Sequence, residues 1–326
     1  MDSDLTPAVY AALGAFAANT ILCPIIIPWL EKLKFGQFVR GDGPSKHLKK
    51  AGTPTMGGIM IILSFVFIAI LFEGQHSENL ALILVTLGFG TIGFIDDFIK
   101  ITKKRSLGLK AWQKMLGELL ITGAFAAYLM NVRQAPGQSV VYIPFLHSSS
   151  IDLGWFYVPF LFLVMLGTVN GANFTDGLDG LASGVTVLIT AFFCFAAWAM
   201  GSPVLPLAGA AVGSLLGFLL FNSYPAKVFM GDTGSLALGG FVAAIAILLK
   251  MPLFVLIVAL IYLLEVLSVI IQVSVYKMTR KRVFKMAPIH HSFELSGWSE
   301  TKIVALFYVV TAILCLVGYL GGRYII

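Results

Sequence analysis

Residues 303–321 read IVALFYVVTAILCLVGYLG, a run without a charged side chain. About twenty apolar residues in a helix span the hydrocarbon core of a bilayer, so this run predicts a transmembrane helix. Nine similar runs precede it, at residues 8–29, 57–72, 80–95, 115–130, 155–169, 181–200, 205–221, 235–249 and 253–275. The sequence therefore predicts an all-α polytopic membrane protein with about ten transmembrane helices, forming a single integral membrane domain over residues 1–326.

The composition excludes an ordinary soluble protein. Hydrophobic residues make up 58% of the chain, charged residues only 12%, and the mean hydropathy is +0.92. Cys23, Cys194 and Cys315 lie within apolar runs and lack the spacing of metal ligands, so we expect neither a disulfide framework nor a zinc site. The segment before the first apolar run lacks Lys and Arg, which favours a retained helix over a cleaved signal peptide.

The basic residues predict how the chain crosses the membrane. Loops 30–56, 96–114 and 276–302 each hold six Lys or Arg residues, whereas the loops on the other side hold only Arg133, Lys250 and Arg323. Because basic loops stay on the cytoplasmic side, both termini are expected to face outward. The formal charge of +6 then reflects topology and attraction to anionic lipid, and no nucleic acid partner is expected. Residues 139–153 favour a small outer β-hairpin.

The acidic residues are concentrated at three predicted cytoplasmic helix ends. The five carboxylates there belong to Asp96, Asp97, Asp176, Asp179 and Asp232. Placing an ionisable side chain within the membrane costs free energy, so such residues usually belong to a functional site. Carboxylate oxygens, completed by water, are the ligands that Mg²⁺ takes, and Mg²⁺ at such a site usually holds phosphates. The acids therefore indicate a metal and phosphate site, although Asp96 and Asp97 alone would also fit a solvated helix end beside lysines.

Two motifs sharpen this prediction. In NGANFTDGLDG, the polar residues Asn173, Asp176 and Asp179 recur every three positions and are expected to share a face. A Gly-rich turn with capping Asp and Asn is the alternative. In FMGDTGS, Asp232 lies at an expected helix N-terminus, where free N–H groups favour anions, although an ordinary N-cap is the alternative. Phe229 either stacks on a base or anchors the interface.

Other polar residues within and between the spans leave two interpretations open. The pair His290 and His291 in the last basic loop indicates a functional role. Glu118 and Glu265 lie within predicted spans, where carboxylates also occur in proton-coupled transporters. A cation-coupled transporter is therefore an alternative, but its usual inverted repeats and midplane acids are not found in this sequence.

Five motifs taken together resemble one enzyme family. They are KKAGTPTMGG, DDFIK, NGANFTDGLDG, FMGDTGS and APIHHSFE, in this order on the predicted cytoplasmic loops. They resemble the polyprenyl-phosphate N-acetylhexosamine 1-phosphate transferases, and within that superfamily the phospho-N-acetylmuramoyl-pentapeptide transferases. The acidic motifs are shared with sister transferases that use other UDP-amino sugars. The chain departs from the family pattern at Ser292, where a third consecutive histidine is usual.

The resemblance implies a reaction and its partners. The expected reaction transfers phospho-MurNAc-pentapeptide from UDP-MurNAc-pentapeptide to undecaprenyl phosphate, giving lipid I and UMP in the first membrane step of peptidoglycan synthesis. It further implies a Mg²⁺ cofactor, a bacterial plasma membrane location with the active site on the cytoplasmic face, and a homodimer. Either direct attack by the lipid phosphate or a covalent aspartyl intermediate would give these products. Direct attack is favoured, because clustered metal-binding acids need not be nucleophiles.

The resemblance also implies roles for individual residues. Asp232 and Asp97 are the expected Mg²⁺ ligands, and Asp96 is expected to activate or orient the lipid phosphate. Asn173 and Asp176 are expected near the sugar phosphate. The other expected binding residues are Lys50, Asp179, Asn222 and Phe229 for uridine, Thr55 and Gly231 along the same cleft, and Lys104, Lys114, His290 and His291 for phosphates or the sugar-peptide. The lipid acceptor also needs a groove open to lipid, and an irregular or bent ninth span around residues 265–276 is expected to form it.

Overall fold

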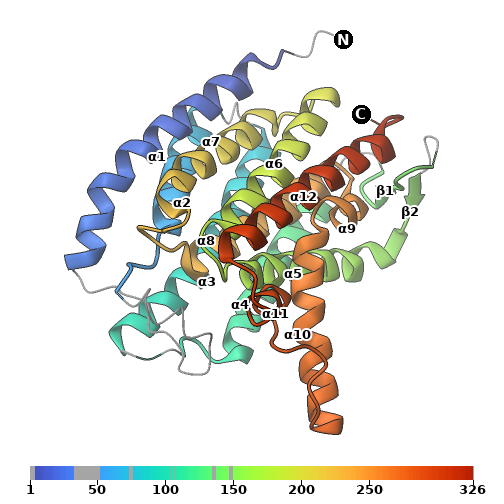
Figure 1. Cartoon of the computed structure of the whole chain (residues 1–326). Coiled ribbons are helices and arrows are strands. Elements are labelled where there is room, and N and C mark those ends of the chain that lie inside the picture. The colour runs from blue at the N-terminus through green and yellow to red at the C-terminus, as the bar shows by residue number, and fades with distance from the viewer. Residues whose placement is uncertain are drawn as a thin grey trace.

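Helices dominate the structure, a computed structural model that describes residues 4–32, 52–72, 76–103, 105, 107–133, 137–146 and 150–325. The helices pack side by side in a bundle, and both ends of the chain lie at the same end of it (Figure 1). Within the described residues, nine helices are long and apolar enough to cross a membrane, and α2 is a shorter apolar helix. The prediction of an all-α polytopic membrane protein is confirmed.

Each of the ten predicted runs falls on one or more helices, and a short helix, α11, was not predicted. The elements are α1 (Thr6–Lys32), α2 (Gly58–Phe72), α3 (Ser77–Thr102), α4 (Ala111–Tyr128), η2 (Leu129–Arg133), β1 (Val140–Tyr142), β2 (Ser150–Asp152), η3 (Gly154–Phe156), α5 (Tyr157–Thr175), α6 (Leu181–Ala199), α7 (Leu205–Asn222), α8 (Gly231–Leu248), η4 (Pro252–Phe254), α9 (Val255–Val258), α10 (Leu260–Thr279), α11 (Ile289–Glu294) and α12 (Glu300–Gly322).

Helix α8 forms the centre of the bundle. Nearly all of its residues are buried, and it packs against α3 on one side and α5 on the other. A helix that is apolar all round is stable only when neighbours or lipid surround it, and here the neighbours are other helices of the same chain. Its first turn is thereby held against the ends of α3 and α5.

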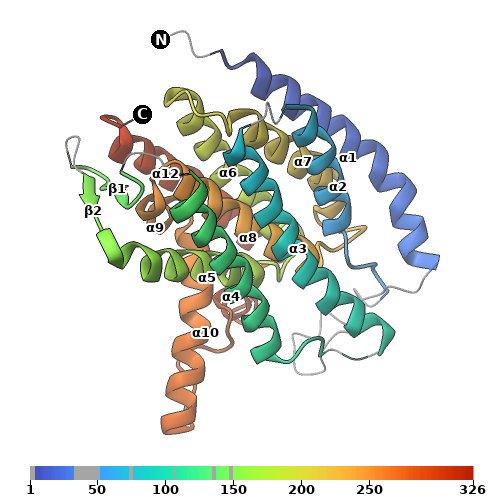
Figure 2. The same ribbon diagram turned by 180° about the vertical axis from the view of Figure 1, so that it is seen from behind.

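The β1–β2 pair lies within the segment that favours a hairpin. Val140 pairs with Asp152 in an antiparallel register, and Tyr142 donates its backbone N–H to the Lys250 carbonyl at 2.9 Å. This pair lies near the C-terminal end of α12, at the same end of the bundle as the chain termini (Figures 1 and 2). At that end, Arg133 joins the Glu78 carboxylate of α3 (2.6 Å) to the final carbonyl of α8.

The ninth predicted run does not form one helix. Its helical path is interrupted at Ala259, between α9 and α10, where φ is −108° and ψ is 29°. Helix α10 is continuous from Leu260 to Thr279, so an interruption of the helix within residues 265–276, one of the two forms expected there, is not found. The sequence did not reveal the break because neither Gly nor Pro marks it. The C-terminal half of α10 projects from the bundle (Figures 1 and 2).

Small residues bring α1 and α7 into close contact. A Cβ added at Gly213 of α7 would overlap the Ala12 carbonyl of α1, and one at Gly209 would overlap the Ala8 carbonyl. In a bilayer, helix association depends on such close packing, because lipid tails are as apolar as the side chains.

Replacing Gly213 by alanine is expected to destabilise the protein, because the methyl group meets a backbone carbonyl that cannot rotate away. Overpacking of this kind typically costs about 1–3 kcal/mol. Thermal unfolding in detergent measures the effect. Gly167→Ala is the matched control, because a Cβ at that helical glycine meets no atom within 4 Å. Equal melting temperatures for Gly213→Ala and Gly167→Ala would contradict the account of this contact.

Candidate active site

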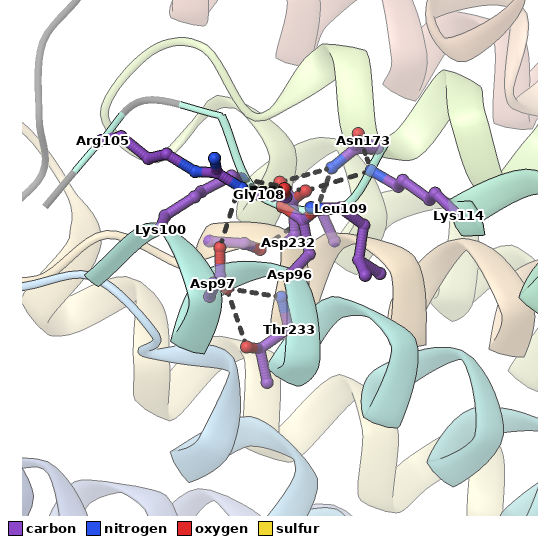
Figure 3. Close-up of polar contacts among 12 residues, drawn as sticks. Asp96, Asp97, Lys100, Arg105, Gly108, Leu109, Lys114, Asn173, Asp232 and Thr233 are labelled. Atoms are coloured by element: carbon purple, nitrogen blue, oxygen red, sulfur yellow. Dashed lines mark hydrogen bonds and ion pairs between the residues drawn. The ribbon is translucent and has the colours of Figure 1, made fainter. Parts of the chain in front are cut away.

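Four helix ends meet at the end of the bundle opposite the chain termini. They are the C-terminal ends of α3 and α5 and the N-terminal ends of α4 and α8, and Figure 3 shows their polar side chains pointing toward one another. Three carboxylates lie at this junction, those of Asp96, Asp97 and Asp232. Ligand oxygens from all three lie within 4.8 Å of one another.

Asp97 anchors α3 to the first turn of α8. Its Oδ2 accepts hydrogen bonds from the backbone N–H of Thr233 at 2.9 Å and from the Thr233 hydroxyl at 2.8 Å. A helix N-terminus offers such free N–H groups and favours a negative charge. The close approach requires Gly93, since a Cβ there would overlap the Asp232 carbonyl. The interpretation of Asp97 as a solvated helix end is therefore wrong, and Asp97 is only 3% exposed.

Asp96 faces the segment that joins α3 to α4. Its Oδ1 accepts a hydrogen bond from the Leu109 backbone N–H at 2.7 Å, and its Oδ2 lies 2.6 Å from the Nζ of Lys100. A Cβ added at Gly108 would overlap the Asp96 carboxylate, so this joining segment closes over the acid. Asp96 is buried, at 4% exposure.

Asp232 lies within the first turn of α8 and is not its N-cap, which is Met230. The Nζ atoms of Lys100 and Lys114 lie 3.1 Å and 3.0 Å from its Oδ2. Its Oδ1 accepts a hydrogen bond of 3.0 Å from the Asn173 amide, which also donates to Ser235 at 2.8 Å. Asp232 thus joins three helices through its side chain, and the N-cap alternative is excluded.

The acidic group has the chemistry of a magnesium site. Mg²⁺ prefers hard oxygen ligands and retains several waters, so carboxylates from two helices suffice to hold it. Asp97 and Asp232 each have an oxygen facing Lys100, at 3.5 Å and 3.1 Å from its Nζ. These oxygens therefore face the cationic side chain of Lys100 in this structure.

The residues after α5 are arranged differently from the prediction. Helix α5 ends at Thr175 and the chain turns, so Asn173, Asp176 and Asp179 do not share one helix face. Burial raises the pKa of the half-buried Asp176 to about 8, with further increases from the negative charges of Asp232 and Asp97. A hydrogen bond from the Gly231 backbone to this carboxyl lowers the pKa and opposes that increase.

Asp179 and Asn222 shape the segment between α7 and α8. The Asp179 carboxylate accepts the Ala226 N–H at 2.9 Å, while Asn222 accepts from the Ser183 hydroxyl at 2.6 Å and donates to the Val228 carbonyl at 2.9 Å. Both side chains are buried. These hydrogen bonds fix the backbone of the segment between α7 and α8.

The segment from Thr55 to Gly58 pairs with the start of α8. Gly57 donates its N–H to the Phe229 carbonyl at 2.8 Å, and Phe229 donates its own N–H to the Pro54 carbonyl at 2.8 Å. A Cβ added at Gly231, where φ is +72°, would meet both the Thr55 hydroxyl and the Asp97 carboxylate. Thr55, Phe229 and Gly231 therefore lie together beside Asp97.

The two histidines belong to α11, which packs against α10. His290 is buried, and its Nδ1 lies 3.1 Å from the Glu265 carboxylate without forming a hydrogen bond of good geometry. His291 lies 2.7 Å from the Glu294 carboxylate. Sequence reasoning missed both carboxylate partners. The contact of His290 with Glu265 depends on how α10 and α11 meet, whereas the spacing of three between His291 and Glu294 on α11 was a usable signal. The buried position of His290 beside Gly177 joins α11 to the turn that holds Asp176.

The lysines expected at the site, and Glu118, have different outcomes in the structure. The structure brings Lys114 and Asn173 together at 3.0 Å, as expected for one site. Lys100 was not predicted as a site residue, although its spacing of four and three from Asp96 and Asp97 was a usable signal. Lys50 and Lys104 lie outside the described residues. The buried Glu118 lies one helical turn after Lys114 on α4. Its carboxylate accepts a hydrogen bond of 2.7 Å from the Asn170 amide.

The chain is similar to one enzyme family over nearly its whole length. The model of the family "Glycosyl transferase family 4" matches residues 79–250, and the "Phospho-N-acetylmuramoyl-pentapeptide-transferase signature 1" matches residues 50–62. A phospho-N-acetylmuramoyl-pentapeptide-transferase of Acetivibrio thermocellus is 51% identical over 98% of this chain and 97% of its own length. The chain belongs to the phospho-N-acetylmuramoyl-pentapeptide-transferase family. A relative of the same name from Clostridium kluyveri is 52% identical over 96% of this chain and 98% of its own.

The family resemblance is thus confirmed, and the departure at Ser292 acquires a structural role. The Ser292 hydroxyl donates to the Met286 carbonyl at 2.6 Å and accepts the Met286 N–H at 3.1 Å. These two bonds close the loop that leads into α11. Ser292 therefore fixes the start of the helix that carries His290 and His291.

Ser292→Ala is expected to loosen this loop, because both polar groups of the Met286 backbone lose their partner. A net loss of about 1 kcal/mol per hydrogen bond is typical. We expect a lower melting temperature and a lower kcat/KM for the nucleotide-sugar substrate, measured on the purified protein. Ser292→Thr keeps the hydroxyl and is expected to behave like the wild type. A Ser292→Ala protein identical to the wild type in both measurements would contradict this role.

Proposed function

We propose that this chain transfers phospho-MurNAc-pentapeptide from UDP-MurNAc-pentapeptide to undecaprenyl phosphate, producing lipid I and UMP. The observation that carries the proposal is the group of three carboxylates with two lysines at one end of a membrane-spanning bundle. This arrangement suits two phosphate-bearing substrates, one soluble and one embedded in lipid. The names and full-length similarity of the relatives support the same reaction.

Mg²⁺ is the proposed cofactor, with Asp97 and Asp232 as its ligands. Bound there, the ion would neutralise charge on the donor diphosphate. Thr233 and Asn173 hold the two carboxylates in position. Phosphoryl transfer is catalysed mainly by positioning and by stabilising negative charge, so preorganised ligands of this kind account for most of the chemistry.

Asp96 is proposed to orient the lipid phosphate or accept its proton. Its carboxylate is held by the Leu109 N–H, next to Lys100, and therefore has a fixed direction. Lys114 supplies positive charge on the other side of Asp232. Direct attack of the lipid phosphate on the donor's β-phosphorus is the proposed route, since the anchored acids act well as metal ligands and as a base.

The nucleotide is proposed to bind beside Phe229, Thr55 and Gly231, with Lys50 contacting the uridine. Lys104 is proposed to bind phosphates or the sugar-peptide. Asp179 and Asn222 support this pocket by holding the segment between α7 and α8. Asn173 and Asp176 are proposed to contact the sugar phosphate, and His290 and His291 the phosphates or the sugar-peptide.

The location follows from the basic residues. We place the active site on the cytoplasmic face of a bacterial plasma membrane, with both termini and the β1–β2 pair on the outer face. The full chain acts as one membrane domain, and a homodimer is its proposed assembly.

The release of UMP by the purified protein in detergent tests this function. UDP-MurNAc-pentapeptide, undecaprenyl phosphate and Mg²⁺ together are expected to release UMP, and omission of the lipid or the metal is expected to abolish release. Asp232→Ala removes a proposed ligand, so a loss of at least about a hundredfold in kcat is expected.

Asp4→Ala is the matched control for that variant, because Asp4 is an exposed aspartate that precedes α1 and lies outside the proposed site. Release from UDP-GlcNAc at an equal rate would identify a sister transferase instead. Undiminished activity of Asp232→Ala would contradict the proposed site.

A further inference from the structure

Lys100 occupies a central position among the three carboxylates. Its Nζ lies 2.6 Å from Asp96, 3.1 Å from Asp232 and 3.5 Å from Asp97 (Figure 3). Lys114, by contrast, reaches Asp232 and Asn173. Among the residues that the structure describes, Lys100 is thus the cation whose ammonium faces all three acids.

Lys100 and a divalent cation require the same oxygen atoms. Mg²⁺ binds carboxylate oxygens at about 2.0–2.1 Å and demands near-octahedral geometry. An ammonium at hydrogen-bond distance from these oxygens blocks that approach, and it also repels a second positive charge. In this arrangement the two cations therefore compete for the carboxylate oxygens that face Lys100.

We propose that Lys100 is an internal counter-ion that a divalent cation must displace, and that the displaced ammonium then binds the phosphates of the donor. The inference rests on the proposed function, because the metal and the donor diphosphate come from it. It assigns Lys100 a positioning role that couples occupancy of the acidic group to binding of the substrate.

The structure allows Lys100 to leave without disturbing the acids. Asp97 keeps its two bonds to Thr233, Asp96 its bond to Leu109, and Asp232 its bond to Asn173. The Lys100 side chain lies in the last turns of α3 and is 29% exposed, whereas Lys114 is 18% exposed. A partly exposed lysine on a flexible four-carbon stem reorients easily.

Two opposite effects follow for a variant that lacks the charge. Lys100→Met removes the competing ammonium while retaining side-chain length, so divalent cations bind more tightly. The same change removes a phosphate ligand, so the donor binds more weakly. A merely structural lysine would not change these two affinities in opposite directions.

Binding of Mn²⁺ to the purified full-length protein in detergent, without substrates, tests the competition. The free ion is counted by electron paramagnetic resonance. Lys100→Met is expected to lower the Kd for Mn²⁺ about tenfold, the effect of losing one charge-assisted hydrogen bond. Lys100→Arg keeps the charge and is expected to bind no more tightly than the wild type.

Lys103→Met is the matched control, because Lys103 is an exposed lysine at the end of the same helix. Its Kd for Mn²⁺ is expected to remain at the wild-type value. At saturating Mg²⁺, the KM for UDP-MurNAc-pentapeptide is expected to rise about tenfold in Lys100→Met and to stay unchanged in Lys103→Met.

Each outcome separates this inference from the proposed function. A Kd for Mn²⁺ in Lys100→Met that is equal to or higher than that of the wild type would overturn the competition, while Mg²⁺-dependent transfer by the wild type would leave the function standing. Tighter Mn²⁺ binding with an unchanged KM would overturn the coupling to the donor. Failure of wild-type protein to bind Mn²⁺ would overturn the proposed metal site itself, and the inference with it.

Discussion

The carboxylate of Asp97 against the first turn of α8 is the contact on which the rest of the site depends. It places the C-terminal end of α3 beside the N-terminus of a nearly fully buried helix, and Gly93 allows the backbones to approach. Asp232, one residue before Thr233, is thereby brought next to Asp96. A cluster of negative charge at this depth is tolerated because helix N–H groups and two lysines oppose it.

Much of the fold was predictable because its physical cause is local. Runs such as 303–321 are long enough to span a bilayer, and every predicted run falls on a helix. The placement of Asp96, Asp97 and Asp232 at helix ends was also visible, since so few acids occur in this chain. What periodicity could not give was where a helix stops, and so Asp176 and Asp179 were wrongly expected to share a face with Asn173.

The remaining differences come from tertiary contacts that no short pattern encodes. The break at Ala259 lacks a Gly or Pro, and the pairing of Glu265 with His290 requires α10 and α11 to meet. The spacing of Lys100 indicates contact with Asp96 and Asp97, but its contact with Asp232 depends on how α3 and α8 pack. Asp179 and Asn222 were expected to bind uridine, and in the structure their buried side chains form hydrogen bonds with the segment between α7 and α8. The sequence thus predicted which residue types form the site more readily than which side chains contact one another.

A divalent cation bound by Asp97 and Asp232, as proposed, would exclude the ammonium of Lys100. Diffraction from crystals of the protein grown with Mn²⁺, collected at the manganese absorption edge, would locate that cation. We expect an anomalous peak at coordination distance from Asp97 and Asp232, with the Lys100 side chain turned away. A peak elsewhere in the protein, or a peak at the acids with Lys100 still in contact with all three, would contradict this expectation.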